Sequence, residues 1–281
     1  LGNVYKRQVW TIGAEGQYTL GAIFGGWTAL ALADFDSPLA PVVVLLAGIL
    51  GGLLWAAIPA ILKTVFRANE ILTSLMLTYV ALLLLDYLVR GPLRDPAGYN
   101  FPESALFSSA TTLPALTSDG RLHLGVLFAF ILAIVMAIAL PTTLKGFEIR
   151  TVGQAPRAAQ FAGFGAKSMI MFVFLVSGAL AGLAGVSEVA GTMGQLLPVI
   201  SPGYGFTAII VAFLGRLNPI GIVFAGLVMS ISFIGGEAAQ IRLGLPLDVS
   251  KVFQGILLFF ILACDTLIYY RLRLRKPRAA T

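Results

Sequence analysis

The stretch TTLKGFEIRTVGQAPRAAQFAGFGAKS, residues 142–168, is polar, small and basic, yet it lies between two runs of nearly pure hydrocarbon side chains. Of the 281 residues in the chain, 58% are hydrophobic and only 11% are charged, and the mean hydropathy is +0.91. Soluble domains carry roughly 25% charged residues. We therefore expect an all-α, polytopic transmembrane helical bundle for which lipid is the main solvent.

Charge-free runs on both sides of this stretch predict about eight spans, since each span needs about 20 apolar residues. The run at 189–215 contains Pro198, Pro202 and Gly203, so we expect a loop or short re-entrant piece there, followed by a helix from about residue 204. The expected spans are 16–33, 39–62, 71–85, 122–144, 168–187, 204–215, 217–236 and 252–270.

Lys and Arg are unevenly divided between the two sides of the predicted bundle. Fourteen of the 19 fall on the side that carries 142–168 and the tail RLRLRKPRAA at 271–280. Cytoplasmic loops carry such an excess, so we expect a multi-pass protein of the cell membrane with a cytoplasmic C-terminus. We treat 1–281 as a single transmembrane domain with an irregular external loop at about 90–121. Because the chain begins with Leu1 rather than Met, we expect that its true N-terminus and one or more upstream helices are missing.

Three pairs of glycines lie four residues apart, a spacing that lets helix backbones approach closely. We expect them to serve helix packing rather than ligand binding. The pairs are Gly21 and Gly25, Gly48 and Gly52, and Gly178 and Gly182.

Several kinds of chemistry are absent from the sequence. It has no GxxxxGK[ST] motif for ATP, no HExxH and no GxSxG, so we expect a packed conduit whose energy comes from elsewhere rather than an enzyme. One cysteine, Cys264, and one histidine, His123, give no disulfide and no metal site, and we expect no cofactor. The positive charge lies between apolar runs, which argues against a nucleic-acid partner. The acidic residues of the spans all lie near span ends, whereas ion-coupled carriers usually place them at mid-membrane.

Within 142–168, Pro156 fixes the first turn of a short helix, and Gly163 and Gly165 end it. Its alanines leave one face narrow enough to enter a groove on a partner, with Phe161 as an anchor. The alternative is an interfacial helix that packs only on lipid headgroups, and the spacing alone leaves both interpretations open.

The segment RTVGQAPRAAQFAGF, residues 150–164, resembles the cytoplasmic coupling segment of ABC-importer permeases of the branched-chain amino acid, ribose and nucleoside group. Further motifs agree in order along nearly the whole chain, and those at 67–79 and 90–96 resemble the nucleoside and simple-sugar branch. Thr11 departs from the family pattern, which usually has Asn there. The further motifs are TIGAEGQYTLGA at 11–22, RANEILTSLMLTY at 67–79, RGPLRDP at 90–96, SGALAGLAG at 177–185 and GYGFTAIIVAFLGR at 203–216.

The resemblance implies cytoplasmic ATP-binding cassette subunits, a second permease subunit of the same or a different chain, and an external substrate-binding protein. ATP-driven closure of the cassettes would move the helix at 155–163 and switch which side of the bundle is open. The residues expected to couple to the ATPase are Arg150, Gly153, Pro156, Arg157, Ala158, Ala159, Phe161 and Gly163.

Two further sets of residues are expected to carry transport. Glu15, Gln17, Asn69, Glu70 and Thr73 are polar, lie near span ends inside the family-like motifs and are candidates to line the substrate path; alternatively, Glu15 and Glu70 balance nearby Lys and Arg. The second set, in the external loop, is a candidate for docking the binding protein, although such loops are often mere connectors. It comprises Arg90, Arg94 and Asp95.

Few buried charges suit an uncharged polar substrate, so a nucleoside or a simple sugar is favoured over an ion. Two other function classes stay open at this stage. One is a secondary, ion-coupled transporter without an ATPase partner, which the shortage of mid-membrane carboxylates disfavours. The other is a membrane scaffold, in which the segment at 142–168 would have no purpose.

Overall fold

A computed structural model describes residues 11–35, 37–116, 122–244, 246 and 248–269. The opening segment with Lys6 and Arg7, the loop residues 117–121 and the basic tail from residue 270 lie outside the described residues. The chain forms two compact units, Leu1–Phe206 and Thr207–Thr281.

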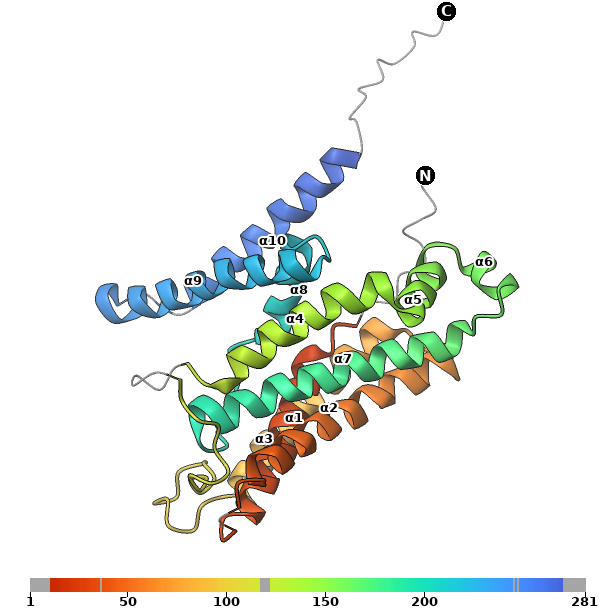
Figure 1. Cartoon of the computed structure of the whole chain (residues 1–281). Coiled ribbons are helices and arrows are strands. Elements are labelled where there is room, and N and C mark those ends of the chain that lie inside the picture. Colours follow the sequence, from red (N-terminus) through yellow and green to blue (C-terminus); the bar gives the residue numbers. More distant parts are fainter. Residues whose placement is uncertain (1–10, 36, 117–121, 245, 247, 270–281) are drawn as a thin grey trace, which may run out of the picture. The chain divides into compact units, whose positions relative to one another are not determined.

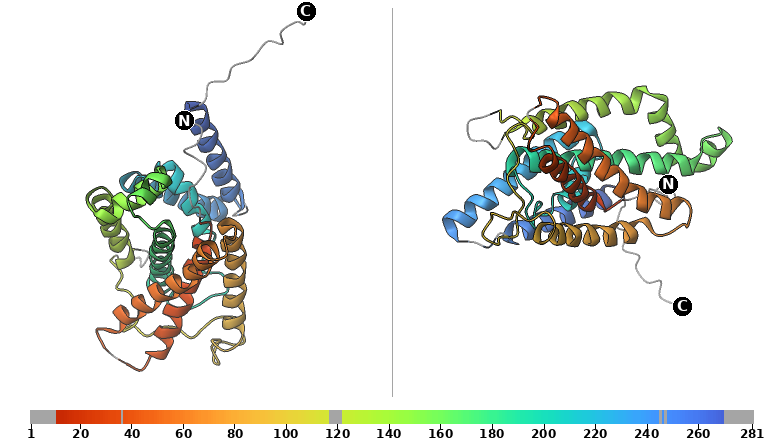
Figure 2. Two further views of the ribbon diagram at one scale, coloured as in Figure 1. Left: turned by 90° about the vertical axis from the view of Figure 1, so that its right-hand side faces the viewer. Right: turned by 90° about the horizontal axis from the view of Figure 1, so that it is seen from below.

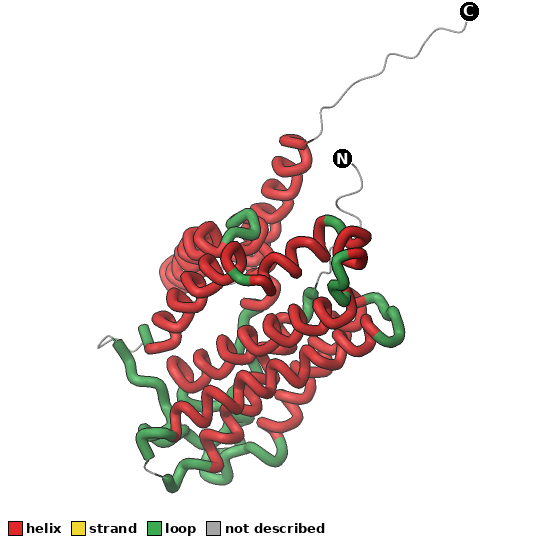
Figure 3. The backbone as a smooth tube through the Cα atoms, turned by 45° about the vertical axis from the view of Figure 1, so that its right-hand side comes forward, coloured by secondary structure: helices red, strands yellow, loops and turns green. Residues whose placement is uncertain are grey.

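All regular structure in the described part of the chain is helical, and the connections between helices are loops and turns (Figure 3). The first unit holds α1 Ala14–Ala31, α2 Ala40–Thr64, α3 Glu70–Arg90, α4 Leu124–Thr142, α5 Leu144–Gln154, α6 Pro156–Phe161, α7 Ala166–Glu188 and the π-helical turn η2 Val189–Met193. The helices α8 Tyr204–Leu214, α9 Pro219–Leu243 and α10 Asp248–Tyr269 follow, and α8 begins at the end of the first unit.

Helix α1 is the centre of the first unit. It packs against α2, α3 and α7, which enclose it (Figures 1 and 2). From Glu15 to Ile23 every residue of α1 is buried. The large hydrophobic side chains of α1 that remain exposed are Phe24 and Trp27, in the second half of the helix.

Glycines make this close packing possible. Gly21 of α1, Gly52 of α2 and Gly182 of α7 meet so closely that a Cβ on any one of them would overlap the backbone of a neighbouring helix. Gly48 and Gly178 extend the same seam along α2 and α7. The expectation that the spaced glycines serve helix packing is confirmed, because only residues without a side chain allow these backbones to touch.

Five helices are long and apolar enough to cross a membrane, judged by length and composition over the described residues. The predicted number of about eight is not confirmed. Helix α1 falls short because its first turns carry polar residues and glycines, which its enclosure by other helices permits. Helix α8 has 11 residues, about 16 Å of helix, too few for a span. The five are α2, α3, α4, α7 with its π turn, and α9.

Helix α7 and the π turn η2 form a continuous helical rod from Ala166 to Met193. Its 28 residues span about 42 Å at 1.5 Å per residue. The arm formed by α5 and α6 lies at the first end of this rod, and the irregular segment 91–116 lies at the other end (Figure 1). The irregularity expected of the long external loop is confirmed over its described residues.

The second unit begins within α8. Gly215 and Gly221 meet at the turn between α8 and α9, where a Cβ on either one would overlap the other's backbone. Asn218 caps α9 by accepting a hydrogen bond from the Ile220 amide at 3.0 Å, and Pro219 occupies the first helical position. The hydroxyl of Thr207 donates to Gln254 at 3.4 Å, which joins α8 to α10.

We predict that Gly182→Ala destabilises the protein by about 1–3 kcal/mol, because the added methyl group must push α2 away from α7. The matched control is Gly226→Ala on α9, where a Cβ meets no atom within 4 Å. Thermal unfolding of the detergent-solubilised protein, followed by size-exclusion chromatography, measures both variants. Equal midpoints for the two variants would contradict the packing described above.

Candidate functional site

A helical arm at one end of the first unit contains the segment 142–168. The chain turns sharply after α4, and Thr143 caps α5 by accepting a hydrogen bond from the Gly146 amide at 3.1 Å. The guanidinium of Arg150 donates to the Leu140 carbonyl at 3.2 Å and so fastens α5 to the end of α4. Helix α5 was not expected from the sequence, although the Thr143 cap and the Lys145–Glu148 pair at 2.7 Å are local signals for it.

The short helix expected from Pro156 is confirmed as α6. It ends before Gly163, whose φ of +80° is a backbone conformation that favours glycine. Phe147 of α5 and Phe164 contact each other edge-to-face with ring centroids 6.2 Å apart, which fixes the far side of the α6 turn. The arm is therefore an ordered structure rather than a loose connection.

The exposure of α6 is uneven. Ala159 is buried, and its carbonyl accepts a hydrogen bond from the Phe164 amide at 2.9 Å. Phe161 is 94% exposed, and Arg157 and Ala158 are exposed with it. The narrow alanine face is thus partly turned toward the protein itself, and an aromatic side chain with a basic neighbour is left for an outside partner. Gly153 is exposed, and a Cβ there meets no atom within 4 Å.

A second polar region lies in the first turn of α1. Glu15 is only 2% exposed, and its carboxylate accepts a hydrogen bond from the Gly205 amide at 2.5 Å. Gly16 lies directly against Thr78 of α3, which is about 12 Å along that helix from Glu70. Glu15 lies in the first turn of its helix, as expected, but it is buried among other helices rather than placed at an exposed edge.

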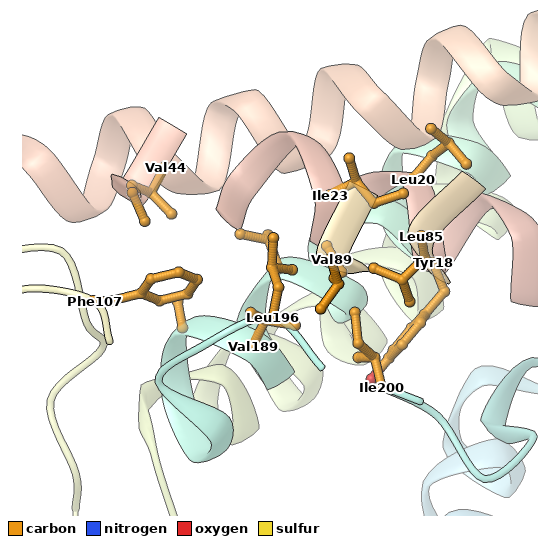
Figure 4. Close-up of a cluster of buried hydrophobic side chains, with 14 of the residues drawn as sticks. Tyr18, Leu20, Ile23, Val44, Leu85, Val89, Phe107, Val189, Leu196 and Ile200 are labelled. Atoms are coloured by element: carbon orange, nitrogen blue, oxygen red, sulfur yellow. The ribbon is translucent and has the colours of Figure 1, made fainter. Parts of the chain in front are cut away.

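The interrupted run at 189–215 contains an irregular segment followed by a helix from residue 204, as expected. After η2 the chain is irregular from Gly194 to Gly203, and α8 then begins at Tyr204. Leu196 and Ile200 of the irregular part are buried in the core beside α1, as Figure 4 shows. Ser201 holds the start of α8, since its hydroxyl accepts hydrogen bonds from the Gly203 amide at 3.0 Å and the Tyr204 amide at 2.8 Å.

Among the described residues of the first unit, three buried side-chain polar atoms have no hydrogen-bond partner. They are Oε1 of Gln17, the hydroxyl of Tyr18 and Nε1 of Trp55. Buried polar groups are normally paired, so each such atom calls for an explanation. Gln17 was a candidate for the substrate path, whereas no sequence pattern singled out Tyr18 or Trp55.

The remaining path candidates lie at the connection between α2 and α3. Glu70 forms an ion pair with Lys63 at 2.5 Å, so the charge-balance interpretation is confirmed for this pair. Asn69 is the N-cap of α3 and accepts hydrogen bonds from the Ile71 and Leu72 amides. The Thr73 hydroxyl donates to the Asn69 carbonyl at 3.0 Å. These contacts give the connection a structural role. The start of α1 lies close to it, because the Ile12 amide donates to the hydroxyl of Ser74, the residue after Thr73, at 3.3 Å.

The irregular segment 91–116 is fastened to the end of α7. Ser104 is buried, and its hydroxyl accepts a hydrogen bond from the Leu196 amide at 2.9 Å. Gln195 donates to the Glu103 carboxylate at 3.2 Å. Backbone hydrogen bonds of 2.8–3.0 Å join Ser104 to Leu196, Phe107 to Gly194 and Leu113 to Ala190. This part of the expected loop is therefore continuous with η2 and with the irregular chain after it.

The docking candidates at the start of this segment form local contacts. Arg90 pairs with Asp86 at 2.8 Å within α3. Arg94 donates to the Asn100 side chain at 2.5 Å, and the Asp95 carboxylate accepts from the Ala97 amide at 2.9 Å. The large exposed hydrophobic side chains nearby are Tyr99, Phe101 and Leu106.

The family model for the permease component of branched-chain amino acid transport systems matches residues 4–262. The chain belongs to this family. Its relatives are transport permease subunits of ABC transporters rather than enzymes. The chain is therefore an ABC transporter permease and a multi-pass membrane protein. The family implies an ATPase and a substrate-binding protein as partners.

Three relatives show which branch of the family the permease resembles. It is 38% identical to the glucose ABC transporter permease of Haloferax volcanii, over 97% of this chain and 74% of the relative. It is 33% identical to the guanosine ABC transporter permease of Bacillus subtilis, over 98% and 79%. It is 32% identical to a nucleoside ABC transporter permease of Lactococcus lactis, over 91% and 72%. No solved structure matches the chain.

We predict that Asn69→Ala lowers the stability of the permease by about 1 kcal/mol without changing substrate uptake per folded molecule, because the residue caps α3. The control is Asn69→Asp, which keeps an oxygen that accepts from the helix amides and should restore the stability. Thermal unfolding and uptake are measured on the same preparations. A large loss of uptake in both variants would instead place Asn69 in the substrate path.

Proposed function

We propose that the permease imports a nucleoside or a simple sugar and that hydrolysis of ATP on a separate cassette subunit drives the import. The relatives with the printed substrates glucose, guanosine and nucleoside support this substrate class. The burial of neutral and singly charged polar side chains in α1, beside a protein-lined interior, suits an uncharged polar molecule. Few charged side chains are available in this part of α1 to balance the charge of a bound ion.

The observation that carries the coupling part of this proposal is the exposure of Phe161. An aromatic side chain that is 94% exposed on a short helix has no packing function among the residues that the structure describes. The helix is nevertheless held in place through Ala159 and through the contact of Phe147 with Phe164. A fixed support beneath an exposed aromatic anchor is the arrangement that a binding hot spot needs. We infer that α6 enters a groove on the cassette ATPase, with Arg157 pairing with a carboxylate there.

The proposal also covers the remaining members of the complex. The excess of basic residues on the side of α6 supports a cytoplasmic position for that side and for the C-terminus. A second permease subunit, identical or different, completes the path through the bilayer. The external binding protein docks near Arg90, Arg94 and Asp95, where Tyr99, Phe101 and Leu106 offer exposed apolar surface.

Gentle extraction of the complete protein from its native membrane, followed by identification of its companions, tests the composition of this complex. We expect a cassette ATPase and a substrate-binding protein to co-purify. The purified binding protein is then titrated with nucleosides and sugars by calorimetry. A permease that is extracted without an ATPase under these conditions, or a binding protein that takes neither class, would overturn the proposal.

We predict that Phe161→Ala weakens the association with the cassette ATPase by about 30-fold, the effect of a hot-spot residue, and abolishes substrate-stimulated ATP hydrolysis. Because the side chain is exposed, the thermal stability of the permease itself should not change. Phe66→Ala is the matched control, since Phe66 is 72% exposed between α2 and α3. Retained coupling in Phe161→Ala would return α6 to the role of an interfacial helix.

A further inference from the structure

Helical structure is interrupted beside the first turns of α1, between the end of η2 and the start of α8. The irregular residues 194–203 pass along α1 in the opposite direction, from Gly26, which touches Leu196, to Glu15, which accepts from Gly205. Non-helical backbone within a membrane bundle is tolerated where it is buried in protein or lines a water-filled path. Broken helices of this kind, with the N-terminus of a half-helix at the break, commonly form substrate sites in transporters.

Tyr18 supplies an independent observation at this break. Its side chain is 6% exposed, and its hydroxyl is completely buried without a hydrogen-bond partner. The ring meets that of Tyr204, the first residue of α8, edge-to-face with centroids 6.4 Å apart. Figure 4 shows the hydroxyl end of Tyr18 beside Ile200 of the irregular segment. Glu15 and Glu188 lie within electrostatic range of this hydroxyl.

An unpaired buried hydroxyl is costly, because the group gives up its hydrogen bonds to water and receives none in return. Phenylalanine would fill the same space in the core without this cost. The hydroxyl of Tyr18 is therefore not explained by packing among Leu85, Val89 and Ile200. A function in a second state of the protein, in which the hydroxyl meets a polar group, explains it.

We propose that Tyr18, together with Glu15 and Tyr204 at the start of α8, forms a hydrogen-bonding subsite for a hydroxyl group of a hexose or of the ribose of a nucleoside. This subsite rests on the proposed function and names the groups that recognise the substrate. The tyrosine hydroxyl can both donate and accept, the carboxylate of Glu15 accepts, and the Tyr204 ring, which is partly exposed, offers an apolar face to a sugar ring.

The subsite is closed in this structure, because Ile200 and its neighbours cover the hydroxyl of Tyr18. Movement of 194–203 away from α1 opens it. Since Ser104 and Phe107 tie this segment to the irregular segment 91–116, a partner that docks there acts directly on the cover of the subsite. A transporter exposes one substrate site to each side of the membrane in turn. This requires a cover such as 194–203 that is stable both in its closed and in its open position.

The test uses the permease reconstituted in liposomes with its ATPase and binding protein. Uptake of tritiated guanosine, 2′-deoxyguanosine and glucose is measured for the wild type, Tyr18→Phe and the control Tyr79→Phe, whose ring is 55% exposed on α3. At saturating binding protein we expect Tyr18→Phe to lower the maximal uptake of the transported probe about tenfold, the value of one hydrogen bond, with basal ATP hydrolysis unchanged. The preference for a hydroxylated probe over its deoxy analogue should also fall in Tyr18→Phe, whereas Tyr79→Phe keeps both quantities.

Thermal unfolding separates this role from a structural one. Removal of an unpaired hydroxyl should leave Tyr18→Phe at least as stable as the wild type, so lost uptake in a stable variant supports the subsite. Glu15→Gln keeps an oxygen for the Gly205 amide and should lower uptake with the same selectivity change. Wild-type uptake with unchanged rate and selectivity in Tyr18→Phe overturns the subsite alone. A wild type that takes up neither a nucleoside nor a sugar overturns the proposed function as well.

Discussion

The contact of three helix backbones at Gly21, Gly52 and Gly182 is the constraint on which the rest of the first unit depends. Lipid tails are as apolar as leucine, so burial of hydrocarbon does little to hold membrane helices together, and close van der Waals contact between backbones must do so. The contact encloses α1 between α2, α3 and α7. A helix that sees protein on most sides can carry Glu15 and Gln17, which a lipid-facing helix cannot bury at acceptable cost.

The same contact makes α7 a common support for both ends of the unit. Its first end adjoins the arm with α6, and the Ala190 carbonyl of its π turn accepts a hydrogen bond from the Leu113 amide of the irregular segment 91–116. π-helical turns are frequent at functional sites, because they interrupt the regular register of a helix. In the account proposed here, docking of the binding protein at one end and ATP hydrolysis at the other both change the position of α7 relative to α1 and α2.

Local sequence patterns predicted the local features well. Pro156 and Gly163 predicted the bounds of α6, and the spaced glycines predicted the close helix packing. Pro198, Pro202 and Gly203 predicted the irregular segment before α8. Each of these features depends on backbone preferences that a single residue controls. The predicted number of about eight spans is not confirmed, because charge-free runs were counted without regard to the shortness of α8 or to the polar residues in the first turns of α1.

Features that depend on residues far apart in the chain were not predictable. Glu15 is buried where Gly205 lies directly against it, and the support of the segment 91–116 arises from hydrogen bonds of irregular backbone near residues 190–196. Neither contact leaves a periodic pattern. Tyr18 was missed for a related reason, since a tyrosine in an apolar helix is ordinary until its hydroxyl is found buried without a partner.

The most direct test of the account is the energy source of uptake. The complete complex, reconstituted in liposomes with the binding protein on the outside, is supplied on the inside with ATP or with a non-hydrolysable analogue, while a proton gradient is maintained in both samples. The account predicts uptake of nucleoside or sugar only in the sample that can hydrolyse ATP. Equal uptake in the two samples would show an ion-coupled carrier and would contradict it.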